Sequence, residues 1–231
     1  MDFARMFQNA TPYILSGVKL CIEISALSLL IGVVLGLITC MFRLSKVRIL
    51  RIIAEIYVWI IRGTPMLVQA MIIYFGIPQL VNLTRDPSEE KFVFTAFVAG
   101  TITLSLNAGA YMSEIFRSGI QAVPKGQSEA ARSLGMTKFG TMRKIVIPQA
   151  FKIVIPSLVN QFIITIKDSS ILSFIGLAEI VNEAKQYVGA TYQYFETYIF
   201  AALCYLAITS VLMIISRYIE KRLKYANKET K

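Results

Sequence analysis

The chain has 231 residues, of which 55% are hydrophobic and only 16% are charged. Soluble domains carry about 25% charged residues, so this composition excludes an ordinary soluble domain and predicts one all-α integral membrane domain over residues 1–231. The formal net charge is +10, but the basic residues cluster in short loops between apolar runs. That is the orientation signal of membrane proteins, so we expect a lipid bilayer and no nucleic acid as partner.

The sequence has no histidine and only three cysteines. Cys21, Cys40 and Cys204 each lie alone in an apolar run, and their spacing is not that of a zinc site. We therefore expect no catalytic residues and no metal site in this chain. The N-terminal residues lack a basic stretch followed by a cleavable apolar core, so no removable signal peptide is expected.

Five apolar segments each reach the roughly 20 residues that a helix needs to cross the hydrocarbon of a bilayer. They lie near residues 13–42, 54–81, 92–116, 153–175 and 194–218. The stretches after them are in turn basic, acidic, basic, acidic and basic. Because positive charge stays on the cytoplasmic side, the pattern predicts five transmembrane helices, with the N-terminus outside, the C-terminus inside, and loop 117–152 in the cytoplasm.

Before the first span, the spacing of the apolar residues predicts a short amphipathic helix that lies on the outer surface. These residues are Phe3, Met6, Phe7 and Ala10. In the first span, the small residues Gly32 and Gly36, four apart, predict a close helix contact.

In the second span, Gly63-Thr64-Pro65 predicts a broken or kinked helix, because proline removes a backbone hydrogen bond. The Thr64 hydroxyl and the free backbone groups at such a break are candidate substrate contacts. Arg62 either holds a substrate carboxylate or pairs with an acidic residue such as Glu114. We favour pairing, because an unpaired arginine in a membrane is costly.

Polar residues at helical spacing form one stripe in the third span and another in the fourth. Such residues inside spans are expensive and usually line a path or contact a partner, although hydrogen bonding between helices is the alternative. We expect the two stripes to face a substrate path, with Asp168 binding a substrate ammonium group and Lys167 turned toward another span. The stripes consist of Asn107, Tyr111 and Glu114, and of Gln161, Thr165 and Asp168.

Loop 117–152 predicts a helix–turn–helix elbow. Ser128 is a plausible N-cap for a first helix, and Gly135 suits the left-handed residue that ends it. Thr137 is expected to cap a second short helix, whose continuation Pro148 should disrupt.

The elbow resembles the EAA loop of permeases from ATP-binding-cassette (ABC) importers. The resemblance rests on Glu129-Ala130-Ala131, which is followed after three residues by Gly135 and after nine more by Ile145-x-Ile147-Pro148. Ile147 stands where the family usually has leucine. Three further motifs resemble the polar amino-acid permeases of this class. They are Arg62-Gly63-Thr64-Pro65, Lys167-Asp168-Ser169-Ser170, and Phe174-Ile175-Gly176 with Glu179.

This resemblance implies a type I importer permease in the bacterial inner membrane. It further implies a second permease subunit, identical or different, an extracellular substrate-binding protein and two cytoplasmic ABC ATPase subunits. Glu129, Ala130, Ala131 and Gly135 would couple the chain to the ATPase, Glu129 by pairing with a basic residue or by capping its own helix. A phosphate-binding loop ends in Gly-Lys-Ser/Thr, and no glycine here precedes a lysine. ATP and magnesium would therefore be bound by the partner ATPase, and we expect no cofactor in this chain.

Three other readings stay open from the residues alone. The solute could be an opine or a cystine-like compound. An ion-coupled secondary transporter would show an internal repeat, which we do not find, and a membrane enzyme would need a catalytic constellation that the sequence lacks. The neutrality of Gln161 favours a neutral polar amino acid, whereas Glu114 keeps a cationic one possible.

Overall fold

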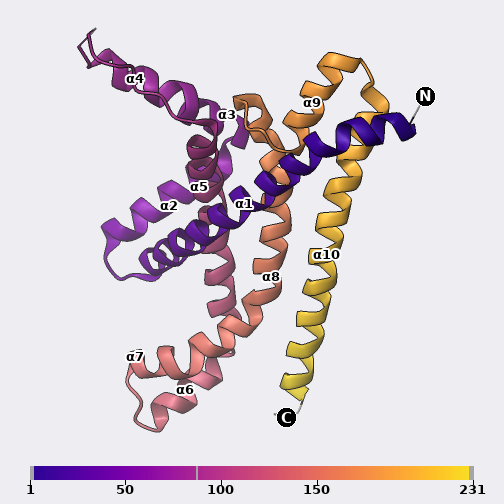
Figure 1. Ribbon diagram of the computed structural model, residues 1–231. Helices are drawn as coiled ribbons and strands as arrows, with labels where there is room; N and C mark the ends of the chain where they lie inside the picture. The colour runs from indigo at the N-terminus through magenta and orange to yellow at the C-terminus, as the bar shows by residue number, and fades with distance from the viewer. Residues whose placement is uncertain (1–2, 87, 229–231) are drawn as a thin grey trace.

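The computed structural model describes residues 3–86 and 88–228, and throughout that part of the chain the regular structure is helical. Helix α1 (Phe3–Leu44) crosses obliquely over a bundle in which α5 (Ala96–Ala122), α8 (Ile147–Asp168) and α10 (Tyr194–Lys228) run roughly along one direction (Figure 1). Helix α5 lies at the centre, because it packs against α1 on one side and α8 on another. The all-α prediction is confirmed.

Within the described residues, four helical stretches are long and apolar enough to cross a membrane: Phe7–Leu44, Met66–Leu83, Lys138–Ile175 and Tyr194–Arg222. The predicted segment 92–116 corresponds to α5, which is long enough but more polar, with buried residues such as Thr103, Asn107 and Ser113. A helix that is covered by other helices need not be as apolar as one that faces lipid. The number of spans and their orientation stay predictions.

The N-terminal segment is continuous with the first span, so the prediction of a separate amphipathic helix on the surface is wrong. Helix α1 runs from Phe3 through Pro12 without interruption. The ring of Phe7 meets that of Phe200 edge-on at 4.7 Å, and Ala10 is fully buried. Phe7 and Ala10 thus belong to one apolar cluster with Phe200 and Ala201 of α10, and this packing holds the start of α1 in the bundle.

Close contact between α1 and α5 explains the two spaced glycines of the first span. A Cβ atom at Gly36 would lie 2.5 Å from the Cβ of Met112, and one at Gly32 would lie 2.8 Å from the Cβ of Ala108. Both distances are too short for real side chains, so the predicted small-residue contact is confirmed.

The second predicted span is broken where expected. Helix α2 (Arg48–Gly63) ends before Thr64, which is extended with φ −122° and ψ 147°. Pro65 then caps α3 (Met66–Met71), and the chain continues through the π-helix η1 (Ile72–Gly76) into α4 (Ile77–Leu83).

Proline 148 does not interrupt its helix, contrary to expectation. Helix α7 (Lys138–Thr141) leads through the π-helix η2 (Met142–Val146) directly into α8. The N–H of Ile147 donates to the carbonyl of Met142, five residues back. This π turn shifts the hydrogen-bond register just before a residue that has no N–H, so the helix continues. The same arrangement precedes Pro78, where Ile77 donates to Ile72.

The predicted elbow is present at one end of the molecule, away from α4 and α9 (Figure 1). Helix α6 (Lys125–Ser133) begins after Pro124, so Ser128 lies within the helix and its predicted role as N-cap is wrong. The fixed φ of proline suits a helix start, which explains the earlier beginning. Gly135 adopts φ +83°, and the Thr137 hydroxyl accepts a hydrogen bond from the Gly140 N–H at 3.1 Å, as predicted.

After α8 the chain forms a 3-10 helix, η3 (Ser169–Ile175), and turns at Gly176 into α9 (Ile180–Thr191). Glu179 is fully buried and caps α9 by accepting from the Asn182 N–H at 2.9 Å. Its other oxygen accepts from the Tyr205 hydroxyl of α10 at 2.5 Å. Glu179 therefore joins α9 to α10.

Candidate functional site

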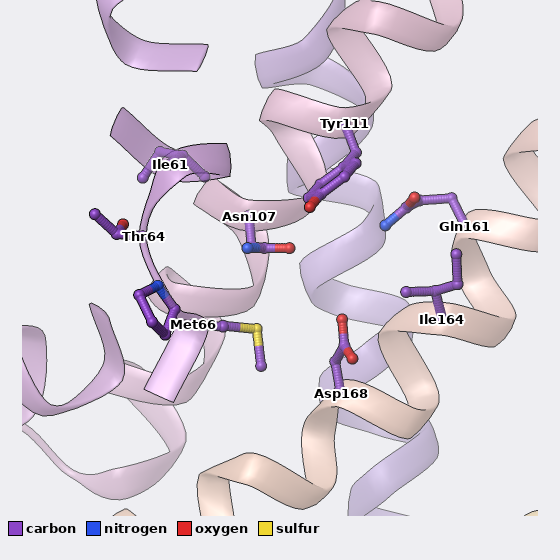
Figure 2. Close-up of a pocket in the computed structure, with 9 residues that line it drawn as sticks. Ile61, Thr64, Met66, Asn107, Tyr111, Gln161, Ile164 and Asp168 are labelled. Atoms are coloured by element: carbon purple, nitrogen blue, oxygen red, sulfur yellow. The ribbon is translucent and has the colours of Figure 1, made fainter. Parts of the chain in front are cut away.

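A cavity of about 440 Å³ lies between the break in the second span and the helices α5 and α8 (Figure 2). The break contributes one wall through Thr64, Pro65 and Met66, since the extended residue bends the chain away from α2. Helices α5 and α8 contribute the other walls. The lining residues are Ile61, Thr64, Pro65, Met66, Asn107, Tyr111, Gln161, Ile164 and Asp168.

Four polar side chains converge in this cavity, two from each predicted stripe. Asn107 and Tyr111 extend from α5, and Gln161 and Asp168 extend from α8 toward them (Figure 2). Asn107 is 9% exposed and Gln161 4% exposed. Within residues 3–86 and 88–228 none of the four side chains has a hydrogen-bond or ion-pair partner. Buried polar groups such as those of Asn107 and Gln161 normally have partners, so the set is suited to a polar ligand or water.

Thr64 lines the cavity, but its hydroxyl is already engaged. It donates to the Ile60 carbonyl at 2.8 Å and accepts from the amide nitrogen of Gln69 at 2.8 Å. The same nitrogen also approaches the carbonyl oxygens of Ile61 at 2.8 Å and of Thr64 at 3.1 Å. Gln69 thus satisfies the backbone groups that the break frees, groups that were expected to face a substrate.

Gln69 did not emerge from the sequence analysis, although a signal was present. It is a single amide in the apolar run from Met66 to Phe75, five residues after Thr64. Polar residues inside apolar spans are costly unless paired. A search for partners of the broken backbone could have found it.

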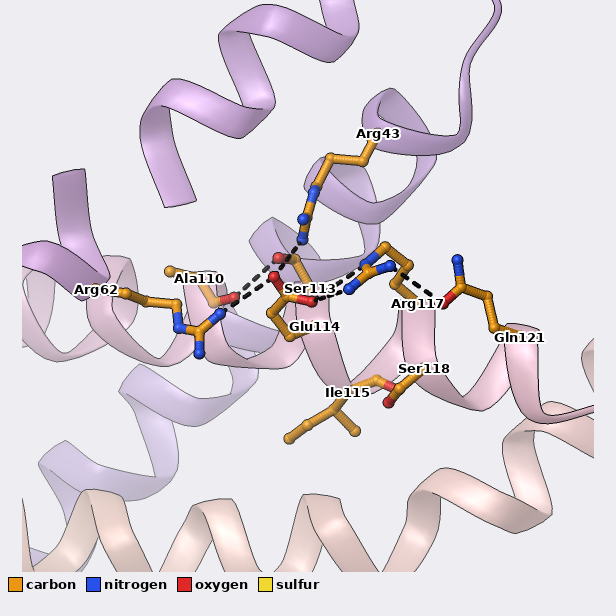
Figure 3. Close-up of polar contacts among 9 residues, drawn as sticks. All are labelled: Arg43, Arg62, Ala110, Ser113, Glu114, Ile115, Arg117, Ser118 and Gln121. Atoms are coloured by element: carbon orange, nitrogen blue, oxygen red, sulfur yellow. Dashed lines mark hydrogen bonds and ion pairs between the residues drawn. The ribbon is translucent and has the colours of Figure 1, made fainter. Parts of the chain in front are cut away.

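Glu114 lies outside the cavity, in a cluster with three arginines (Figure 3). Its Oε1 is 2.9 Å from Arg43 Nη1 and 3.1 Å from Arg62 Nη1. Its Oε2 is 2.8 Å from Arg117 Nη2 and 3.1 Å from Arg117 Nε. The contact with Arg43 has the distance of an ion pair without the geometry of a hydrogen bond.

The pairing of Arg62 with Glu114 is therefore confirmed, while Arg43 and Arg117 were not anticipated. The three guanidinium groups come from α1, α2 and α5, so one carboxylate joins three helices. Because three cations share one anion, the cluster keeps a positive excess.

Two further residues of the fourth span do not line the cavity, although Thr165 belongs to the predicted stripe. Thr165 is buried, does not line the cavity, and donates its hydroxyl to the Gln161 carbonyl at 2.9 Å. Such bonding to the preceding turn is common for threonine in helices. Lys167 is exposed next to Asp168.

The elbow presents a second candidate surface. Glu129 and Ala130 are exposed, whereas Ala131 is buried against the molecule. Leu134 is 86% exposed and Phe139 75% exposed, one on each side of the turn at Gly135. Both residues belong to the loop expected in the cytoplasm rather than to a membrane span, so their exposure makes the elbow a candidate partner surface. Sequence reasoning had missed both.

A second cavity, of about 570 Å³, lies beneath this elbow at the end of α5. It brings Glu129 and Arg132 of α6 next to Gln121 of α5 and Val146 of η2. The elbow and the end of α5, the helix that lines the first cavity, therefore share the walls of this second cavity.

Comparison with known proteins extends over nearly the whole chain. The family described as "Binding-protein-dependent transport system inner membrane component" matches residues 28–225. The arginine transport system permease protein ArtQ of Bacillus subtilis (strain 168) is 39% identical over 224 residues, which cover 97% of this chain and 98% of that protein. The L-cystine transport system permease protein TcyB of the same organism is 42% identical over 218 residues, which cover 94% of this chain and 88% of that protein. A crystal structure of an amino acid ABC transporter with histidines shares 39% identity and a TM-score of 0.89, over 96% of this chain and 99% of that chain.

Proposed function

Because the chain belongs to the family of binding-protein-dependent transport system inner membrane components, we propose that it forms the translocation path for a polar amino acid in an ABC importer. The observation that carries this proposal is the convergence of four polar side chains in one cavity beside a broken helix, none of them with a hydrogen-bond partner in the described part of the chain. Binding sites of transporters are commonly built at such breaks.

The cavity offers groups for both ends of an amino acid. The carboxylate of Asp168 suits an ammonium group, since a charged hydrogen bond is stronger than a neutral one. Asn107, Tyr111 and Gln161 supply amide and hydroxyl groups for the remaining polar atoms. Thr64 borders the site, whereas Glu114 and Thr165 do not line it and are left out of the proposed contacts.

The arginine cluster favours a neutral polar substrate. Glu114 was the acidic residue that kept a cationic amino acid possible, and three arginines hold its carboxylate. A cystine-like solute is the second candidate, because TcyB is 42% identical to this chain.

The proposed complex contains a second permease subunit, identical or different, two ABC ATPase subunits and an extracellular substrate-binding protein. We place it in the bacterial inner membrane, with loop 117–152 in the cytoplasm. The elbow supports ATPase docking through Glu129, Ala130 and the exposed Leu134 and Phe139. ATP and magnesium belong to the ATPase, so this chain contributes no catalytic residue to hydrolysis.

Uptake into proteoliposomes tests the proposal. The chain is reconstituted with its cognate ATPase and binding protein, and labelled glutamine, arginine, cystine and leucine are offered with and without internal ATP. We expect uptake of a polar amino acid that needs both ATP and the binding protein. Uptake driven by an ion gradient in the absence of ATP would contradict the proposal and favour a secondary transporter.

A further inference from the structure

One face of α5 carries a continuous row of polar residues from the first cavity to the elbow. Tyr111, Glu114, Arg117 and Gln121 follow one another at intervals of three or four residues, so they share one side of the helix. Tyr111 lines the first cavity, and Gln121 lines the cavity beneath the elbow.

At the cavity end, Glu114 acts on the break through Arg62. The guanidinium of Arg62 lies over the Tyr111 ring, 5.2 Å from its centre, and its Nη1 is 3.1 Å from Glu114. Arg62 belongs to the last turn of α2, two residues before Thr64. A shift of Tyr111 or of the break therefore moves a cation that is bound to Glu114.

At the elbow end, Glu114 acts through Arg117. Two nitrogens of Arg117 contact Oε2 of Glu114, while its third, Nη1, donates to the Gln121 side chain at 3.1 Å (Figure 3). Gln121 and Glu129 line the same cavity. The orientation of Arg117 thus depends on Glu114 and reaches the base of the elbow.

Charge makes Glu114 the central member of this row. Arg43, Arg62 and Arg117 would repel one another without it, because each lies within 3.1 Å of its carboxylate. Repulsion between partly buried charges is weakly screened. Loss of the carboxylate would separate the ends of α1 and α2 from α5.

We propose that Glu114 is a positioning residue that transmits occupancy of the substrate cavity to the coupling elbow, through Arg62 on one side and Arg117 on the other. The inference rests on the proposed function. In this proposal Glu114 does not bind the substrate itself; it couples the substrate cavity to the elbow through its ion pairs.

The test measures ATPase activity of the reconstituted complex with and without substrate-loaded binding protein. Allosteric couplings typically amount to 5- to 150-fold, so in Glu114→Gln we expect the ratio of stimulated to basal rate to fall at least about 5-fold. This ratio does not depend on how much complex folds. The control is Glu23→Gln, the same change at an exposed residue of α1 whose carboxylate pairs with Lys19 and with none of the three arginines; its ratio should equal that of the wild type.

One further variant keeps the inference falsifiable if Glu114→Gln assembles poorly, and a double variant tests the link where Glu114→Gln does assemble. Arg117→Lys keeps the charge but removes the forked contact with Glu114, and the ratio should fall in the same way. In the double variant Glu114→Gln/Arg62→Gln it should fall no further than in the single variant, because both residues act through one link.

A wild-type ratio in Glu114→Gln or Arg117→Lys, even with a reduced yield of complex, would overturn the inference and leave Glu114 a purely structural residue. Additive effects in the double variant would overturn it as well. Uptake by the wild-type complex reports separately on the proposed function, since that uptake does not depend on any variant.

Discussion

The side-chain amide of Gln69 closes the helix break by donating to the carbonyl oxygen of Ile61, 2.8 Å away. The break leaves carbonyls of the last turn of α2 without the N–H partners that a continuous helix would supply. Gln69, one turn into the next helix, provides a donor for Ile61 and for Thr64. Because the amide belongs to α3 and contacts the end of α2, it ties the two helices together across the break and supports one wall of the cavity.

Replacing Gln69 should destabilise the chain and impair transport. A buried polar group that loses its partner costs about 1–3 kcal/mol, and Gln69→Leu leaves the carbonyls of Ile61 and Thr64 without a donor. We expect a lower thermal midpoint of the purified complex and slower uptake. The control Gln79→Leu, at an exposed position of α4, should leave both unchanged. Equal midpoints for the two variants would show that the break does not need the amide.

The contact between α1 and α5 should tolerate no side chain at Gly36. A methyl group there would meet Met112 at 2.5 Å and the Gly109 carbonyl at 3.1 Å. Overpacking of this kind costs about 1–3 kcal/mol, so Gly36→Ala should lower the thermal midpoint. Gly189→Ala, where nothing lies within 4 Å of the added Cβ, serves as the matched control and should be neutral or slightly stabilising. An unchanged midpoint for Gly36→Ala would mean that the helices can move apart.

Asp168 should be the strongest single contact of the substrate. A hydrogen bond to a charged group contributes about 1.5–3 kcal/mol, so Asp168→Asn should weaken substrate handling about 10- to 150-fold. The measurement is the concentration dependence of ATP-driven uptake. Glu23→Gln, the same kind of change at an exposed residue of α1, should behave as the wild type. Unchanged uptake by Asp168→Asn, at normal ATPase activity, would make Asp168 a structural residue.

The exposed apolar residues of the elbow should contribute to ATPase binding. Burial of a leucine or phenylalanine side chain contributes about 1.5–3 kcal/mol, so Leu134→Ser or Phe139→Ser should weaken the complex about 10- to 150-fold. Co-purification of the ATPase, with titration of the affinity, measures this. The control is Val93→Ser, which changes an apolar residue that is likewise exposed, at 71%, but lies outside the elbow. In this variant the ATPase should stay bound.

Two variants of the elbow, one that alters its backbone and one that alters its charge, should each uncouple transport from ATP hydrolysis. Gly135 has φ +83°, whereas proline requires φ near −65°, so Gly135→Pro cannot keep the turn. Glu129→Arg reverses an exposed charge on α6. We expect both variants to insert in the membrane but to lose uptake or the ATPase. Wild-type uptake with bound ATPase in both variants would show that coupling occurs elsewhere.

The predicted orientation can be tested by labelling introduced cysteines. We expect an impermeant thiol reagent to modify Asp86→Cys from outside intact cells and to reach Lys228→Cys only after the membrane is opened. The parent protein controls for the native thiols, of which Cys21 and Cys40 are buried. Equal labelling of both positions from outside would contradict five spans with the C-terminus in the cytoplasm.

Features that depend on a few neighbouring residues were predictable from the sequence. The break at Thr64-Pro65 follows from the missing N–H of proline, and the turn at Gly135 follows from the conformational freedom of glycine. The placement of Asn107 with Tyr111 on one face of α5, and of Gln161 with Asp168 on one face of α8, follows from helical periodicity. In each case the physical cause acts within one or two helical turns.

Features that depend on residues far apart in the chain were decided by the tertiary structure. Glu114 has the spacing of a cavity residue, yet Arg62, 52 residues away, and Arg43 of α1 bind its carboxylate. Helix α5 can carry buried polar residues because α1 and α8 cover it, and Pro148 is accommodated by a π turn whose register the local sequence does not reveal. Ion pairs and burial depend on which helices become neighbours, and that follows from the packing of the whole chain rather than from any single segment.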